Sequence, residues 1–141
     1  MKKKIILINI IVIIVIIVTI EIFANFFKIS NLMGIEKGLI KVKNDIHVMV
    51  PNSSGIHFGQ KIYIDKNGYR VPSENYKYKE VNIIYIIGDS TSFGNGIIEE
   101  KTFVGILRKN FNNWDIINSS VPGYNANEYL NNIQKIDKYK N

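Results

Sequence analysis

The stretch VNIIYIIGDSTSFGNG, residues 81–96, decides the fold class. Residues 81–87 are a short continuous apolar run, which is typical of a parallel strand that is buried on both faces. Gly88, Asp89 and Ser90 follow where that strand ends. The stretch therefore predicts a buried strand over 81–87 and, directly after it, a loop that exposes a serine hydroxyl.

Residues 99–111, EEKTFVGILRKNF, predict a helix after this loop. Acidic residues at its start and basic residues at its end complement the helix dipole. Four apolar side chains recur at helical spacing, and we expect them to face the core: Phe103, Ile106, Leu107 and Phe111.

A second strand and a last helix follow. Residues 114–118 (WDIIN) predict a short strand, residues 121–125 (VPGYN) a turn, and Asn127 is expected to cap a helix. The apolar residues expected on that helix's buried face are Leu130, Ile133 and Ile136. The order strand, helix, strand, helix predicts an α/β fold with a right-handed βαβ unit and parallel strands.

The ends of the two strands carry the candidate chemistry. Ligands bind beyond the carboxyl ends of strands in a parallel α/β sheet, and Ser90 lies there. Its own N–H can stabilise an oxyanion. Gly123, at the end of the second strand, lets a reacting carbonyl approach and supplies a second N–H donor. The alternative is that Gly88-Asp89-Ser90 is only a polar loop, and the tripeptide alone does not decide between the two.

Other glycine motifs are excluded at this loop. A phosphate-binding P-loop needs lysine after its second glycine, whereas Asn95 follows Gly94. A nucleophile elbow needs glycine at the position of Ser92, and a dinucleotide fingerprint needs glycine at the position of Glu99.

Two segments resemble the GDSL, or SGNH, hydrolases. IIGDSTSFGNG (86–96) resembles their first sequence block, with Ser90 as nucleophile, and INSSVPGYNANEY (117–129) is similar to the second block, whose glycine supplies an oxyanion N–H from Gly123. DKNGYRVP (65–72) is similar to the lead-in of membrane-anchored members. The resemblance covers about residues 60–141. It implies a flavodoxin-like three-layer α/β/α fold, Gly88 and Asp89 in support of Ser90, no cofactor or metal, and hydrolysis or acyl transfer on carbohydrate or lipid esters.

The resemblance is partial. The family's third block supplies an oxyanion asparagine and its last block an Asp-x-x-His pair, and no residues of this chain match either. His47 and His57 precede Ser90, opposite to the family order, so neither is assigned as the base; both are expected to be surface or strand residues. We therefore expect the N-terminal portion of an ester hydrolase, truncated before the catalytic Asp and His. The alternative is a non-catalytic, membrane-anchored remnant or binding module on the same scaffold.

The N-terminal segment predicts a membrane anchor. Residues 5–27 are almost entirely apolar and would form about 34 Å of helix, enough to span a bilayer core. An uncleaved anchor is favoured over a signal peptide, because the apolar core exceeds the usual roughly 7–15 residues and only Ala24 is small near its end. The lysines at 2–4 predict a single-pass protein of the cell membrane with residues 28 onward extracytoplasmic.

Composition limits the remaining classes. The 141 residues include no cysteine and two histidines, which excludes disulfides and thiolate or histidine-rich metal sites. The net charge is +6, but most of the basic residues are scattered among acids and tyrosines and form no basic patch, which argues against a nucleic-acid partner. Strands are expected at 45–51 and 61–72, with a turn at Asn67-Gly68. The expected division is an anchor over 1–27, an extracytoplasmic β-rich lead-in over 28–80 and the hydrolase portion over 81–141.

Overall fold

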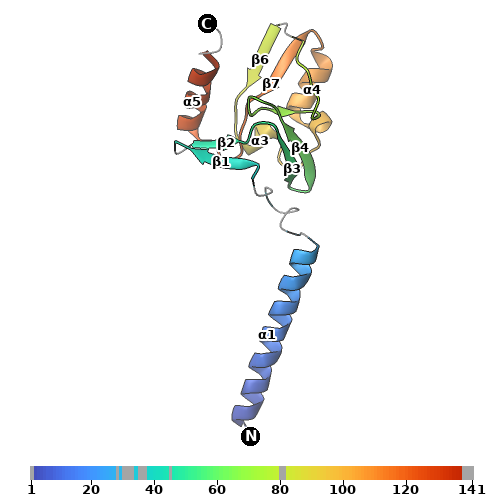
Figure 1. The fold of residues 1–141 in the computed structure, drawn as a ribbon, viewed down its shortest axis with the longest axis vertical. Helices are drawn as coiled ribbons and strands as arrows, with labels where there is room; N and C mark the ends of the chain where they lie inside the picture. The colour runs from blue at the N-terminus through green and yellow to red at the C-terminus, as the bar shows by residue number, and fades with distance from the viewer. Residues whose placement is uncertain are drawn as a thin grey trace.

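The N-terminal helix stands apart from a mixed α/β body in the computed structural model (Figure 1), which describes residues 2–27, 29, 34, 38–44, 46–79 and 82–137. Helix α1 spans Lys2–Phe26, and its apolar window is 0% buried against the rest of the described structure. The helix is long and apolar enough to cross a membrane, as an anchor or a signal sequence is.

One five-stranded sheet forms the centre of the body. Its strands, in spatial order, are β3 (Ser53–His57), β4 (Gln60–Ile64), β5 (Arg70–Val71), β7 (Trp114–Asn118) and β6 (Asn82–Ile86). Strands β6 and β7 are parallel, which confirms the predicted pairing, and the other neighbours are antiparallel. Strand β5 joins the antiparallel strands β3 and β4 to the parallel pair β7 and β6, because Arg70 pairs with Asn118. The sheet therefore includes strands from both sides of residue 80.

The predicted turn at Asn67-Gly68 divides the expected strand 61–72 into β4 and β5. Gly68 has a φ of 85°, and its N–H donates to the Asp65 carbonyl at 3.1 Å, a backbone shape that glycine adopts without strain. The other expected strand becomes β2 (Ile46–Met49), paired with β1 (Ile40–Lys43) in a separate hairpin. Residues 45 and 81, where two expected strands begin, lie outside the described residues.

The helix expected over 99–111 is divided into a 3₁₀ turn at Glu99–Lys101 and helix α4, Phe103–Asn110. The Thr102 hydroxyl caps α4 by accepting the Gly105 N–H at 2.9 Å. A side-chain cap at this position ends the 3₁₀ turn and starts a new helix.

Asn125, and not Asn127, caps the last helix, α5 (Ala126–Asp137). The Asn125 side chain accepts the N–H of Asn127 at 2.9 Å and that of Glu128 at 3.4 Å. Glu128 returns the contact, because its carboxylate accepts the Asn125 N–H at 2.8 Å. This reciprocal capping box fixes the helix start two residues earlier than predicted.

The apolar faces predicted for the two helices are largely exposed. Exposed fractions are 58% for Phe103, 49% for Ile106, 55% for Leu130 and 44% for Ile133. Helix α4 instead buries Val104 and Gly105, and α5 buries Ile136. In Figure 1 the two helices lie on either side of β6 and β7. Within the described residues no strand pairs with the outer edge of β6, and no element covers these exposed helix side chains.

The main apolar core lies next to the loops that follow β6 and β7. Its buried members come from the β1–β2 hairpin, strand β4, the helix after β6 and the loop after β7: Leu39, Met49, Ile62, Ile64, Phe93 and Val121. The hairpin therefore packs against the end of the sheet that carries the candidate chemistry.

Candidate active site

Ser90 is the first residue of helix α3 (Ser90–Phe93), four residues after the end of β6. Asp89 caps this helix, its carboxylate accepting the Thr91 N–H at 2.8 Å. Gly94, with a φ of 85°, ends the helix and donates its N–H to the Ser90 carbonyl at 3.1 Å. The first N–H groups of a helix have no intrahelical partner, so the Ser90 N–H is a potential donor. Among the described residues, none forms a side-chain hydrogen bond to the Ser90 hydroxyl.

The loops after β6 and β7 stay paired beyond the strands themselves. The Ser119 N–H donates to the Ile86 carbonyl at 3.0 Å, and the Val121 N–H donates to the Gly88 carbonyl at 3.1 Å. A Cβ atom at Gly88 would lie 2.4 Å from the Ser92 hydroxyl, so glycine lets the first turn of α3 close against the strand end. This pairing brings the loop of Gly123 to the same end of the sheet as Ser90.

Gly123 lies in the predicted turn, which the Tyr124 N–H closes by donating to the Val121 carbonyl at 3.2 Å. Its φ is 90°, and an added Cβ would meet nothing within 4 Å. Backbone conformation therefore accounts for the glycine, and the space beside it is open. A cavity of about 390 Å³ opens there, lined also by His47, Asn125 and Glu128. Ser90 does not line this cavity.

Arg70 was not predicted as part of the site, yet it holds the segment that follows Ser90. Its side chain is fully buried. One guanidinium nitrogen donates to the carbonyls of Phe93 and Gly94 at 2.7 Å each, and the other donates to the Ile97 carbonyl at 2.6 Å. One signal in the sequence could have indicated this role. Arg70 lies in a short strand beside apolar Val71, and a buried arginine needs hydrogen-bond or ion-pair partners.

Two further buried groups complete this polar network. Glu99 pairs with Arg70 at 2.9 Å and also with Arg108, whose guanidinium donates to the Arg70 carbonyl at 3.1 Å. Burial raises the pKa of Glu99, although the two guanidinium groups oppose that shift. The Asn118 amide donates to the Ser92 and Phe93 carbonyls at 3.3 and 3.4 Å. Strands β5 and β7 thus fix α3 through its carbonyl groups.

The two histidines are held by partners other than Ser90. His57 lies on β3 and is 0% exposed. The expectation of a strand residue is therefore confirmed, and that of a surface residue is wrong. The His57 Nε2 lies 2.5 Å from the Asn95 side-chain oxygen, and burial lowers its pKa. Half-exposed His47 lies on β2, its Nδ1 3.3 Å from a Glu128 oxygen. The Asn125 N–H, and then His47, lower the pKa of Glu128.

The described residues contain no cluster of three or more histidine, aspartate or glutamate side chains arranged to hold a metal ion. No family model, curated protein or solved structure matches the chain.

Proposed function

We propose that this chain carries the nucleophile and two oxyanion donors of an SGNH-type serine ester hydrolase or acyl transferase. The observation that supports the proposal most is the shared position of Ser90 and Gly123. They follow the carboxyl ends of two adjacent parallel strands, on loops joined by the bond between Val121 and Gly88. In this proposal β6, β7, α4 and α5 belong to a flavodoxin-like three-layer sheet.

The proposed reaction is acyl transfer through a covalent intermediate. The Ser90 hydroxyl attacks the ester carbonyl, and the N–H groups of Ser90 and Gly123 donate to the developing oxyanion. The alcohol leaves, and water or a second alcohol takes the acyl group from Ser90. The proposed substrates are esters of carbohydrates or lipids.

The proton of Ser90 needs a base, and we assign that role to a histidine other than His47 and His57. His57 is buried against Asn95, and His47 faces Glu128. Removal of the histidine from a serine-protease triad costs about 10⁶ in kcat, so this chain alone should be nearly inert.

A second candidate function is a non-catalytic, membrane-anchored binding module. The observation that favours it is that both histidines have partners other than Ser90. The two candidates differ in one outcome: only the hydrolase gains activity when a base is supplied.

That difference gives the experiment. The chain should be joined to a downstream segment that carries the asparagine and Asp-x-x-His of an SGNH hydrolase, and hydrolysis of an aryl acetate should be measured. We expect hydrolysis from the joined chain and none from the chain alone. Ser90→Ala should abolish it, whereas Ser73→Ala, at an exposed position away from Ser90, should not. A folded joined chain whose activity survives Ser90→Ala would exclude the hydrolase.

We also propose that α1 is an uncleaved anchor that leaves the α/β body outside the cell. The length and apolar character of α1 and the lysines at 2–4 support this. Protease added to intact cells should then remove the body, and the N-terminus of the membrane-bound product should lie near Met1. A soluble product that begins near Asn25 would show a cleaved signal peptide instead.

A further inference from the structure

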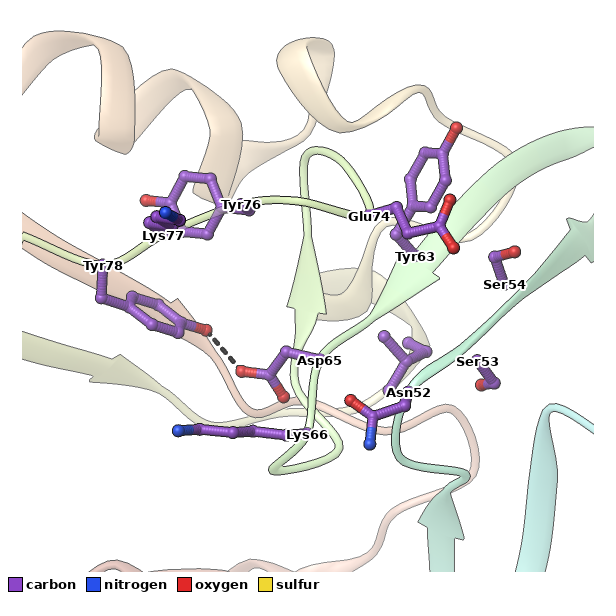
Figure 2. A pocket seen from close by; sticks show the side chains of 11 residues that line it. Asn52, Ser53, Ser54, Tyr63, Asp65, Lys66, Glu74, Tyr76, Lys77 and Tyr78 are labelled. Carbon is purple, nitrogen blue, oxygen red and sulfur yellow. Dashed lines mark hydrogen bonds between the residues drawn. The ribbon is translucent and has the colours of Figure 1, made fainter.

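A separate cavity of about 570 Å³ lies on the face of β4 that points away from the core. Ile62 and Ile64 are buried, with exposed fractions of 1% and 4%. Side chains alternate along a strand, so Tyr63 between them points to the opposite face. The segment after β5 supplies the facing wall. Figure 2 shows Tyr63 and Glu74 on one side of the cavity and Tyr78 on the other.

Hydrogen bonds within the protein hold the Tyr78 side of the cavity in place before any ligand binds. The Tyr78 hydroxyl donates to Asp65 at 2.9 Å, the bond drawn in Figure 2, and the other Asp65 oxygen accepts the Asn67 and Tyr69 N–H groups at 2.8 Å each. Burial, and then the Asp65 carboxylate, raise the pKa of Tyr78, so its hydroxyl stays protonated. Tyr76 stacks edge-on against Tyr78 at 5.2 Å. A preformed wall lowers the entropy cost of binding.

Other polar groups of the cavity remain available. The side chains of Asn52, Ser54 and Glu74 line it, and among the described residues none of the three forms a side-chain hydrogen bond. The Asn52 backbone is held in place, because its N–H donates to the Asp65 carbonyl at 2.9 Å. An amide, a hydroxyl and a carboxylate together can both donate and accept hydrogen bonds.

The charges that line the cavity balance. Lys66 and Lys77 are matched by Asp65 and Glu74. A site with balanced charge gives no net attraction to an ion, and tyrosine rings beside free polar groups suit a ligand that has apolar C–H faces and many hydroxyls. The volume falls within the roughly 300–1,000 Å³ of small-molecule sites.

We propose that this cavity binds a neutral saccharide, with a sugar ring against the face of Tyr63 opposite the Lys61 ammonium, which lies 5.1 Å from the ring centroid, and with its hydroxyls bonded to Glu74 and Asn52. The site is formed by β3, β4 and the segment after β5. It uses neither Ser90 nor Gly123, so it stands or falls independently of the hydrolase.

The test is saturation-transfer NMR on the full chain in lipid nanodiscs, with empty nanodiscs as the blank. The probes are cellobiose and N,N′-diacetylchitobiose, with glucuronate as the charged comparison. We expect saturable, millimolar binding of at least one neutral disaccharide and weaker binding of glucuronate. Tyr63→Ala should weaken binding about tenfold, the upper value for one lost ring contact.

Three further variants separate the site from a loss of fold. Tyr63→Phe keeps the ring and should stay within about threefold of the parent, a difference below 1 kcal/mol. Glu74→Ala, at an exposed position, should weaken binding without loss of folding. Ser90→Ala should leave binding unchanged. Absence of saturable binding to either disaccharide, binding that survives both Tyr63→Ala and Glu74→Ala, or loss of binding in Ser90→Ala would each overturn the proposal.

Discussion

The Arg70 guanidinium donates a hydrogen bond of 2.7 Å to the Phe93 carbonyl, and so joins the short strand β5 to the helix that begins at Ser90. Arg70 is fully buried, so its guanidinium cannot bond to water in place of the Phe93 carbonyl. Its charge is met by Glu99, which also pairs with Arg108. The position of Ser90 therefore depends on a residue that precedes it in the chain and comes from the lead-in strands.

Replacement of Arg70 should destabilise the α/β body strongly. Arg70→Met removes the donors to three carbonyls and leaves Glu99 with Arg108 alone. We expect the free energy of unfolding to fall by about 3–5 kcal/mol, as when one partner of a buried ion pair is removed. Urea unfolding of the full chain in micelles, followed by circular dichroism, measures this loss. Lys101→Met, at an exposed position, is the matched control, and equal stability of the two variants would contradict the role of Arg70.

Local patterns were enough to predict the two parallel strands and the turn between β4 and β5, but not β1, β3 or α3. The apolar run at 81–87 and the segment 114–118 became the parallel pair β6 and β7, and Asn67-Gly68 became a turn. These features depend on neighbours in the sequence. The partners of Arg70 could not be predicted in this way, because Phe93 and Glu99 reach it only after β5 has docked on β7.

Two misplaced features have different physical causes. Asn125 and Asn127 are equally good capping residues, and the choice depends on the turn before them and on the return contact from Glu128. Phe103 on α4 is exposed although it lies in the predicted apolar stripe, because helical periodicity marks such a stripe without showing what covers it.

The outer edge of β6 should make the body prone to self-association. Ile83 is 49% exposed on this edge, and an exposed apolar edge strand is a template for pairing. Ile83→Lys should therefore lower the aggregation rate of the 28–141 fragment in light scattering at 37 °C. Gln134→Lys adds the same charge on the exposed surface of α5 and should change little. An equal effect of the two substitutions would point to net charge and not to the strand edge.

Gly94 and Gly123 should respond differently to alanine. Both have positive φ, which costs an alanine about 1–2 kcal/mol. At Gly94 the new Cβ would also lie 2.5 Å from a Thr102 methyl group, whereas at Gly123 it would meet nothing within 4 Å. We expect Gly94→Ala to lose about 1–3 kcal/mol more than Gly123→Ala in urea unfolding, because of this overpacking.

Thr102→Ser tests the cause of that difference. It removes the methyl group and keeps the hydroxyl that caps α4. In the Gly94→Ala background it should recover most of the extra loss. If Gly94→Ala lowers the free energy of unfolding no more than Gly123→Ala does, Thr102 can move aside at little cost. The close packing at Gly94 then does not contribute to stability.

Buried His57 should make stability depend on pH. Its pKa in the folded chain is lowered by burial, whereas an unfolded histidine has a pKa of about 6.5. The unfolded state therefore binds a proton first as the pH falls. The contribution of His57 to the free energy of unfolding should be constant above about pH 7.5 and fall between about pH 7 and 5, by at most about 1.4 kcal/mol per unit.

A histidine comparison isolates this effect. His57→Asn should remove this fall in stability between about pH 7 and 5, whatever it does to stability at pH 8. His47→Asn, at a half-exposed position, should leave the slope in place. A slope unchanged in His57→Asn would mean that another group binds the proton.

The most direct test of the central claim, that Ser90 occupies a nucleophile's position without a base, is labelling by a fluorophosphonate probe. The labelled residue is identified by mass spectrometry. We predict no labelling of the chain alone under conditions that fully label an intact serine hydrolase. The chain joined to the asparagine and Asp-x-x-His segment should be labelled at Ser90, and Ser90→Ala should remove the label. Labelling of the bare chain at Ser90 at the rate of an intact hydrolase would contradict the claim, and would make His47 or His57 the base.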